Sequence, residues 1–371
     1  MPKKIIVAMS GGVDSSVAAA LLKKQGFVVI GVFMKFWLAR RSPGEGGKAF
    51  NRCCSSDAER RAREVASILD IPFYVFNFEK EFKKRVVDYF LKEYAAGRTP
   101  NPCVVCNKDI KFGLLLERTL SLKADFIATG HYVRKAGNKL FKGKDKEKDQ
   151  SYFLWQLSQK QLKHSLFPLG SYTKKQVKEM AKKFGLPVLS IPESQEICFV
   201  ENTIGEFLTK YIKQKKGEIV DAQGKVLGEH QGLSLYTIGQ RRGLGFIGGP
   251  AFAKPACRRG RASAGKPYWV LRKDLKMNVL VITKDEEDLF EKELFFKEAN
   301  WISGKSPKVP AILKATIRYR HKVVQGVLQK GNRFIFNKPQ RAITPGQSIV
   351  FYLPRRQAGK GQELLGGGII R

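Results

Sequence analysis

Hydrophobic and polar positions in the first third of the chain alternate between two patterns. Short apolar runs typical of buried strands are separated by longer segments whose apolar residues recur at helical spacing. The predicted strands are 4–9, 28–34, 72–76 and 126–129, and the predicted helices are 14–25, 57–69, 81–94 and 109–122. Such alternation predicts an α/β domain with a parallel sheet, helices on both faces, and any ligand at the carboxyl ends of the strands.

From about residue 217 the pattern changes to short β-rich segments separated by Gly, Pro and Asn. These segments are 217–226, 268–271, 279–283, 311–319, 323–329, 334–336 and 348–352. Their spacing predicts a small β-containing central domain followed by a β-barrel or sandwich. The Gly-, Pro- and Arg-rich stretch 248–266 is predicted to be a long loop whose arginines could touch phosphate. We therefore expect three domains, at 1–203, 204–284 and 285–371.

Composition supports a folded protein without a membrane segment. The chain has 371 residues, of which 43% are hydrophobic, enough for packed cores. No run approaches the roughly 18 consecutive apolar residues that a membrane helix needs. The apolar run at the start leads into Ser-Gly-Gly rather than a small-residue cleavage site, which favours a buried strand over a signal peptide. We expect a cytoplasmic protein with no membrane partner.

Charge points to a polyanionic partner. The 68 Lys and Arg residues exceed the 33 Asp and Glu residues, for a formal net charge of +35. Solubility alone needs a net charge of only about 2–8 on a small domain. Neutralising nucleic-acid phosphates releases counterions, so an excess this large favours RNA or DNA as partner, with an anionic membrane surface as the alternative.

A glycine-rich turn joins the first predicted strand to the first helix. Its sequence is Ser10-Gly11-Gly12-Val13-Asp14-Ser15-Ser16. The glycines let the backbone approach an anion closely, and the following helix directs its free N–H groups and positive dipole end at it. The serines add hydroxyl donors, and Asp14 can hold Mg²⁺. The turn matches neither the G-x-x-x-x-G-K-[ST] nor the G-x-G-x-x-G pattern. A chance Gly-Gly turn is the alternative.

Two of the cysteines stand beside features that favour reactivity. The chain has six, at Cys53, Cys54, Cys103, Cys106, Cys198 and Cys257, too few for a disulfide framework in a chain of this length. Cys106 precedes the predicted helix 109–122, where the dipole and Lys108 would stabilise a thiolate. Cys198 is isolated in Gln195-Glu196-Ile197-Cys198-Phe199. Buried, inert cysteine is the alternative for either one. Cys53, Cys54 and Cys257 receive no role.

With these segments in view, the sequence resembles the tRNA-specific 2-thiouridylase family, within the N-type ATP pyrophosphatases (the PP-loop group). The matching segments are 10–16, 31–35, 97–102, 106–108, 128–132, 148–153, 197–199, 228–232, 237–241, 344–347 and 366–370. They cover nearly the whole chain. The resemblance implies a Rossmann-like PP-loop domain, a small central domain and a C-terminal β-barrel that contacts tRNA.

The resemblance also implies roles at matching positions. ATP would contact Ala8, Met9, Ser10, Gly11, Gly12, Val13, Asp14, Ser15, Met34 and Gly130. The target base would face Asn101, Pro102 and Cys103, and tRNA would contact His131, Lys148, Asp149, Gln150, Arg318, Tyr319 and Gln347. Catalysis would use Asp14 at the turn, Cys106 as nucleophile and Cys198 as carrier of a persulfide.

One residue departs from the family pattern. Many members have Asp where this chain has Cys103, which creates a C-x-x-C with Cys106. Cys103 is either a small residue beside the base pocket or, together with Cys106 and Cys198, a ligand of an iron–sulfur cluster, as in some other tRNA thiolases. The four histidines show no recognisable metal-ligand spacing.

The implied reaction has two stages. The uridine C2 oxygen attacks the α-phosphate of ATP, with Mg²⁺ and the turn stabilising the departing pyrophosphate. Sulfur from Cys198 then replaces the activated oxygen, and Cys106 releases it by thiol–disulfide exchange. An upstream persulfide carrier must reload Cys198. Two other functions fit the turn or the charge, namely an ATP-dependent ligase of a small molecule and an RNA-binding module with a vestigial nucleotide site.

Overall fold

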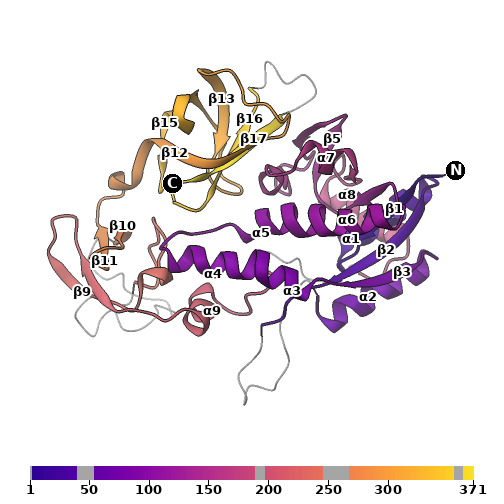
Figure 1. Ribbon diagram of the computed structural model, residues 1–371, viewed down its shortest axis with the longest axis horizontal. Helices are drawn as coiled ribbons and strands as arrows, with labels where there is room; N and C mark the ends of the chain where they lie inside the picture. The colour runs from indigo at the N-terminus through magenta and orange to yellow at the C-terminus, as the bar shows by residue number, and fades with distance from the viewer. Residues whose placement is uncertain (1, 40–53, 189–196, 245–266, 355–361) are drawn as a thin grey trace, which may run out of the picture.

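The first sheet is parallel and carries the N-terminal strands at its centre (Figure 1). The computed structural model describes residues 2–39, 54–188, 197–244, 267–354 and 362–371. The sheet has the order β3 (Phe73–Asn77), β2 (Val28–Lys35), β1 (Lys4–Ala8), β4 (Phe126–Ala128) and β7 (Ser165–Leu166), and every pairing is parallel. This confirms the predicted parallel α/β architecture and the four strands found from the sequence.

The helices of this region are α1 (Val13–Lys24), α2 (Ser56–Ile68), α3 (Glu79–Phe82), η1 (Lys83–Val87), α4 (Asp88–Ala95), α7 (Gln159–Lys163), α8 (Lys174–Lys183) and α9 (Ile204–Tyr211). α1 and α2 pack on β2 and α7 packs on β7, whereas α8 packs on α1 and α9 packs on α4. In α2, the hydroxyl of Ser55 accepts from Ala58 N, and Ala58, Ala62 and Val65 are buried along one face. The cap satisfies an orphan donor while that face builds the core.

The helix predicted at 109–122 begins earlier in the structure, at Pro102. A continuous helical run comprises α5 (Pro102–Val105), the π-helical η2 (Cys106–Leu114) and α6 (Leu115–Ser121). Asn101 is its N-cap and Pro102 its first residue. Proline is preorganised for that position, because its fixed φ suits the first turn and its missing N–H would have no intrahelical partner. The prediction that Cys106 precedes the helix is therefore wrong, since Cys106 lies about one turn inside it.

The central region forms a small separate sheet. Its order is β10 (Trp269–Asp274), β11 (Val279–Thr283), β8 (Gly217–Val220) and β9 (Val226–His230). Ile219, Val270 and Leu280 lie in its own small core. The predicted loop 248–266, with Arg258, Arg259 and Arg261, lies outside the described residues.

The C-terminal region is a closed antiparallel barrel. Its strands run in the order β12 (Phe290–Trp301), β15 (Arg333–Arg341), β14 (Val324–Gln329), β13 (Ala311–Thr316), β16 (Ser348–Tyr352) and β17 (Glu363–Ile370), and β12 pairs with β17 to close it. Short 3₁₀ turns are η3 (Ser151–Leu154), η4 (Leu233–Leu235), η6 (Glu287–Leu289) and η7 (Lys330–Asn332). The predicted terminal β-barrel is confirmed.

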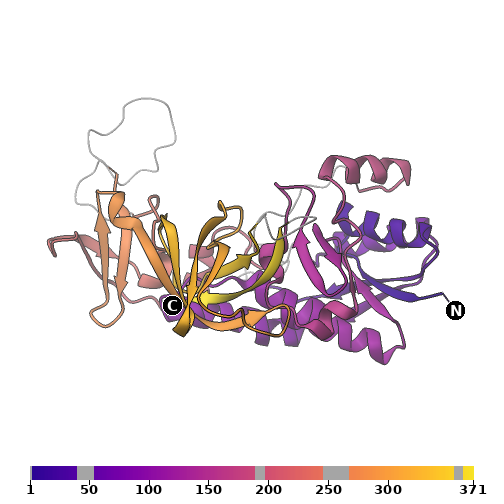
Figure 2. The same cartoon turned by 90° about the horizontal axis from the view of Figure 1, so that it is seen from above.

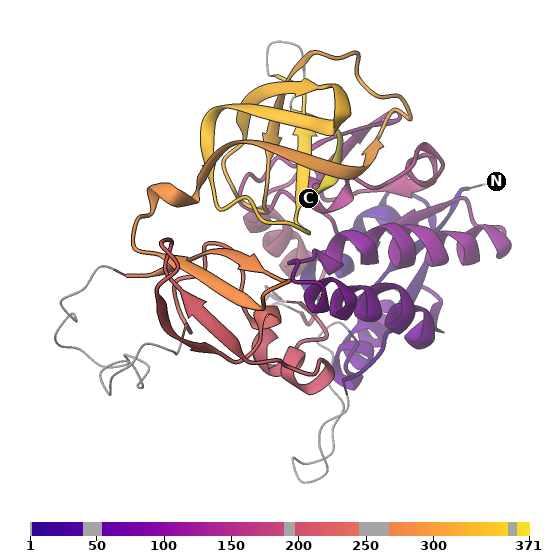
Figure 3. The same ribbon diagram turned by 60° about the vertical axis from the view of Figure 1, so that its left-hand side comes forward.

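A hairpin from the N-terminal half of the chain extends the barrel sheet. It consists of β5 (Val133–Ala136) and β6 (Lys139–Lys142), and β6 pairs with β17 through Leu140↔Leu364 and Phe141↔Glu363. Figure 2 shows the barrel beside the first sheet, and Figure 3 shows the barrel and the central sheet against the side where α4 and α5 lie. The barrel and the first domain are thus joined by backbone pairing as well as by packing.

None of the helices that the structure describes is long and apolar enough to cross a membrane.

Candidate active site

At Gly11 the glycine turn has a backbone that only glycine accommodates. Gly11 has φ +71°, and a Cβ there would lie 2.2 Å from the carbonyl oxygen of Ala58. Gly12 caps α1 without a side-chain hydrogen bond, so no side chain closes the first turn of that helix. The Ser15 and Ser16 hydroxyls donate to the Gly12 carbonyl at 3.1 and 2.9 Å. They therefore brace the turn, which leaves backbone N–H groups as the main anion donors.

The turn lies at the point where the sheet reverses its strand order. It follows β1, whose neighbours are β2 on one side and β4 on the other. Gly130, just after β4, packs against the turn so closely that a Cβ would lie 2.9 Å from Ser15 N. Ligands of open α/β sheets bind at such switch points. Gly130 and the turn, predicted to share one ligand, are therefore in contact.

Asp14 is held by two donors from distant elements. The Tyr132 hydroxyl and Lys174 Nζ each lie 2.7 Å from Asp14 Oδ1. The Asp14 side chain is 35% exposed. On the other side of the turn, Arg61 Nε in α2 donates to the Gly11 carbonyl at 3.2 Å. Lys174 and Arg61 were not found from the sequence, because nothing local marks their contact with the turn.

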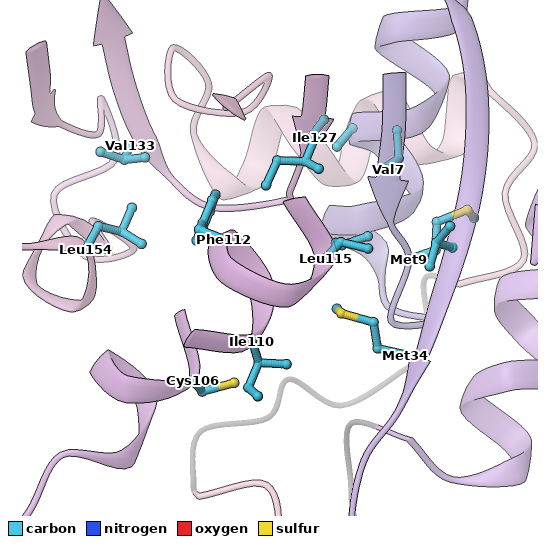
Figure 4. Packing of buried hydrophobic residues seen from close by; sticks show 14 of the residues in the cluster. Val7, Met9, Met34, Cys106, Ile110, Phe112, Leu115, Ile127, Val133 and Leu154 are labelled. Carbon is cyan, nitrogen blue, oxygen red and sulfur yellow. The ribbon is translucent and has the colours of Figure 1, made fainter. Parts of the chain in front are cut away.

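The helix that begins at Pro102 carries two of the predicted reactive or base-facing cysteines. Cys103 is exposed, whereas Cys106 is buried at 9% exposure in the same hydrophobic cluster as the first sheet. Figure 4 shows the Cys106 side chain beside Ile110, extending towards the side of the cluster where Met34 lies. Met9 and Met34, predicted to contact ATP, are both buried at the ends of β1 and β2. These predicted residues therefore share one region of the core.

Cys198 borders the same core from another segment. It is half-buried and packs against that cluster together with Ile197. Cys54 is buried and directs its thiol to the Phe36 carbonyl at 3.5 Å, while Cys53 and Cys257 lie outside the described residues. Across the described ranges, no three His, Cys, Asp or Glu side chains form a group that could hold a metal ion. Cys103, Cys106 and Cys198 do not form a cluster site there.

Residues predicted to contact tRNA lie partly inside the fold. His131 is buried, its Nδ1 lies 2.7 Å from Thr129 Oγ1, and burial together with the Lys111 charge lowers its pKa well below the ordinary value. Asp149 accepts from Gly143 N, and burial raises the pKa of its carboxyl. Gln150 accepts from Tyr132 N at 3.0 Å. These side chains shape the loop, and their direct contact with RNA stays a prediction.

Three predicted tRNA residues lie in the barrel region, and two of them, Tyr319 and Gln347, contact the N-terminal part of the chain. Tyr319 packs on Phe153 with ring centroids 4.5 Å apart. Arg318 donates to the carbonyls of Arg341 and Ala342, each at 2.7 Å. Gln347 Nε2 donates to the Thr99 carbonyl at 2.8 Å, just before Asn101. Asn101 lines a small pocket with barrel residues Gly346 and Ser348. The predicted base-facing and tRNA-contacting segments therefore meet at one junction.

A large basic cavity opens where the β5–β6 hairpin meets the barrel. Its volume is about 1090 Å³. Its charged and titratable lining residues are Arg134, Lys142, Lys144, Lys146, Asp149, Lys314, His321 and Lys322. Only Asp149 of these was among the predicted site residues. The lysine-rich run 139–148 is a sequence signal for three of these residues, Lys142, Lys144 and Lys146, whereas the contribution of Lys314, His321 and Lys322 from the barrel region depends on the tertiary fold.

Comparison with family models divides the chain into three matched segments. Residues 3–202 match the model described as tRNA methyl transferase HUP domain, and 205–284 match the tRNA methyl transferase PRC-barrel domain. Residues 291–370 match the aminomethyltransferase beta-barrel domain.

Full-length relatives carry a consistent name. The tRNA-specific 2-thiouridylase MnmA of Carboxydothermus hydrogenoformans is 44% identical, over 99% of this chain and 97% of its own length. The tRNA-specific 2-thiouridylase MnmA of Acetivibrio thermocellus is also 44% identical, over 100% and 99%. Among solved structures, a 4-thiouridine synthetase–RNA complex with bound ATP has 20% identity and a TM-score of 0.33, covering 53% of this chain and 44% of its own.

Proposed function

Because the chain belongs to the tRNA-specific 2-thiouridylase family, we propose that it is a sulfurtransferase that uses ATP to replace the C2 oxygen of the wobble uridine in tRNA by sulfur. The observation that carries this proposal is the junction of three features. They are the glycine turn packed on Gly130, the helix bearing Cys106, and the barrel docked on the segment before Asn101.

The first step activates the base. The uridine C2 oxygen attacks the α-phosphate of ATP, the bond from that phosphorus to the bridging oxygen breaks, and pyrophosphate leaves with the electron pair. Backbone N–H groups of the turn and the positive end of α1 stabilise the charge that grows on pyrophosphate. Asp14 and phosphate oxygens would hold the accompanying Mg²⁺, whose charge neutralises the phosphates when it is bound. The described bonds to Asp14 all go to Oδ1, which fits a carboxylate with room on its other oxygen.

The second step transfers sulfur. The terminal sulfur of a Cys198 persulfide attacks C2, and AMP leaves with the former C2 oxygen. The Cys106 thiolate then attacks Cys198 Sγ, which releases 2-thiouridine and forms a Cys106–Cys198 disulfide. A dithiol reductant reopens the disulfide, and an upstream sulfur carrier restores the persulfide. Because the three cysteines form no metal group among the described residues, we derive no step through an iron–sulfur cluster.

The basic cavity and the net charge of +35 support tRNA as substrate. A stem-loop would place phosphates along the lysine-lined cavity while an unstacked base enters beside Asn101. RNA loops are recognised in this way, because their bases are already accessible and their backbone is uniformly negative.

The test is an assay with purified full-length protein, ATP, Mg²⁺, an anticodon stem-loop RNA and a persulfide donor. Pyrophosphate release should rise with RNA, and mass spectrometry should find 2-thiouridine at one position. Pyrophosphate release without any need for RNA, and without thionucleoside, would instead indicate a small-molecule ligase. Tight RNA binding without pyrophosphate release would indicate a binding module.

A further inference from the structure

The segment 97–101, which links α4 to α5 and ends at Asn101, is contacted by all three regions of the fold (Figure 3). α4 holds it through Arg98, whose Nε and Nη2 each donate to a Glu93 carboxylate oxygen at 2.6 Å. The barrel binds both the N–H and the carbonyl of Thr99. The remaining contacts come from the central region, which contains none of the predicted site residues.

Two side chains of the central region reach this segment. Leu275, in the turn between β10 and β11, lies directly against Gly97, which has φ +70°, and a Cβ at Gly97 would collide with it. Thr237 reaches Thr99, and the two hydroxyl oxygens lie 3.2 Å apart, within hydrogen-bond distance. Glycine at position 97 permits this close approach of the central region, and the approach brings the Thr237 hydroxyl to Thr99.

The backbone at Thr237 is fixed from two sides. Thr237 begins a tight turn in which Gln240 N donates to the Thr237 carbonyl at 3.0 Å, and Gly239, with φ +79°, occupies the turn position that favours glycine. Gly239 N donates to the Val270 carbonyl of β10 at 2.8 Å, and Val270 N donates to the Gln240 carbonyl at 3.0 Å. Gly239 also lies against Ala342 of the barrel region. The hydroxyl is therefore held on a supported turn.

Thr99 lies two positions before the start of the helix that carries Cys106. Asn101 is the N-cap of that helical run and Pro102 its first residue. A shift of Thr99 therefore moves the predicted base-facing residues and the helix start together. Reacting groups are sensitive to such movement, since a misplacement of about 1 Å can cost roughly 100-fold in rate.

We propose that Thr237 is a positioning residue for thiolation, whose hydroxyl fixes Thr99 and thereby sets where Asn101 receives the target base. The inference rests on the proposed function and deepens it, because it gives the central region a part in the reaction. The distance of 3.2 Å exceeds the usual value of about 2.7–2.8 Å between hydroxyl oxygens. Hydrogen bonds that align reacting groups often shorten only when the substrate is bound.

A contact that only joins the central region to the first domain makes a different prediction. Its loss would lower thermal stability and tRNA affinity, and would leave the thiolation rate at saturating tRNA unchanged. Loss of a positioning contact lowers that rate while tRNA affinity stays close to the wild-type value.

The experiment compares Thr237→Val, which keeps the shape of the side chain without its hydroxyl, with Thr237→Ser, which keeps the hydroxyl. Single-turnover thiolation is measured on full-length protein with saturating ATP and anticodon stem-loop RNA and a persulfide donor, and filter binding gives the RNA affinity. Thr209→Val is the matched control, since its hydroxyl donates to the Gly205 carbonyl within α9. Thermal unfolding of each variant reports the structural contribution.

Thr237→Val should lower the thiolation rate about fivefold, as expected for one lost hydrogen bond, while RNA affinity changes by less than about twofold. Thr237→Ser should restore most of the rate, and Thr209→Val should match the wild type. Thr99→Val should lower the rate by a similar factor. The double variant Thr99→Val/Thr237→Val should fall no further than either single variant, because each change removes the same bond.

A rate for Thr237→Val within about twofold of wild type overturns the inference alone. The same holds if Thr237→Ser is no faster than Thr237→Val, or if RNA binding weakens while the rate at saturation is unchanged. A wild-type protein that forms no 2-thiouridine under these conditions overturns the proposed function as well.

Discussion

Gln347 Nε2 on the barrel donates to the Thr99 carbonyl at 2.8 Å. In the opposite direction, Thr99 N donates to the Pro345 carbonyl of the barrel at 2.9 Å. Gly346 lies so close that a Cβ there would be 2.9 Å from Thr99 N. The segment that leads into Asn101 is thus held by the barrel as well as by α4, where the Glu93 carbonyl accepts from Arg98 N at 2.9 Å.

Gln347→Ala should therefore impair thiolation more than ATP chemistry. Without this hydrogen bond the free energy of unfolding should fall by about 1 kcal/mol. Thiouridine formation should fall severalfold while pyrophosphate release without RNA stays unchanged. Gln325→Ala, on an exposed strand position of the same barrel, is the control and should change neither. Equal activity of the two variants would refute the positioning role.

Asp14→Asn should abolish base activation. The amide can still accept from Tyr132 but no longer balances Lys174 or binds a divalent cation well, so tRNA-dependent pyrophosphate release should fall by about 100-fold or more. A pyrophosphate assay with thermal unfolding checks this. Asp57→Asn, at a carboxylate 71% exposed in the neighbouring helix, should behave as wild type. Normal turnover in Asp14→Asn would contradict the assigned role.

Cysteine replacements distinguish sulfur transfer from a Cys198 persulfide from sulfur transfer through an iron–sulfur cluster. Cys198→Ser should permit pyrophosphate release and yield no 2-thiouridine, because no persulfide can form on serine. The persulfide route tolerates Cys103→Ser, whereas a three-cysteine cluster requires Cys103. Thionucleoside analysis, with iron and sulfide determination on protein purified without oxygen, distinguishes them. Thiolation by Cys198→Ser at the wild-type rate would disprove the persulfide assignment.

Neutralising the barrel side of the basic cavity should weaken tRNA binding and its salt dependence together. In the double variant Lys314→Ala/Lys322→Ala, the slope of log K against log salt should fall by about one to two, one for each phosphate that no longer meets a lysine. Filter binding over a salt series gives the slope. The pair Lys182→Ala/Lys183→Ala, in the last turn of α8, carries the same charge change outside the cavity. An identical slope for both pairs would place the RNA elsewhere.

The central sheet should become more stable as pH rises above 8. Burial lowers the pKa of Lys273 to about 8, and among the described residues its Nζ has no hydrogen-bond partner. Between pH 8 and the ordinary lysine value of 10.5, the unfolded chain binds more protons than the folded one, so stability increases with pH.

Lys273→Met should therefore stabilise the protein at pH 7, by up to about 3 kcal/mol, with an advantage that shrinks towards pH 10.5. Hydrogen exchange of the central strands at several pH values measures this difference in unfolding free energy. Lys276→Met, at an exposed position, is the control. If the difference in unfolding free energy between wild type and Lys273→Met did not change with pH, the Lys273 amine would be solvated in the folded protein.

Sequence patterns located the parts of the site that are encoded locally. The turn at 10–16 was predictable because an apolar strand, two glycines and a helix follow one another directly. The early helix start had a local signal too, since Asn101-Pro102 is an N-cap followed by a proline suited to the first helical turn. The β5–β6 hairpin is marked by Gly137-Asn138, a turn dipeptide between two short strands.

The remaining contacts depend on tertiary structure. Gly130 meets Ser15 because the strand order places β4 beside β1, and Lys174 meets Asp14 because α8 packs on α1. Lysines are abundant in this chain, so nothing in the spacing distinguishes Lys174 from its neighbour Lys175. The roles of Cys106 and Cys198 came from the resemblance and stay predictions.

The pairing of β6 with β17 also constrains how the chain folds as the ribosome makes it. Strand β6 emerges long before β17, the strand that completes the barrel circle with β12. During that interval the hairpin presents an unpaired edge, a template for wrong association. A ribosome-bound chain arrested before residue 363 should therefore expose this strand edge and bind chaperones. Chaperone binding should fall once β17 pairs with β6 and β12.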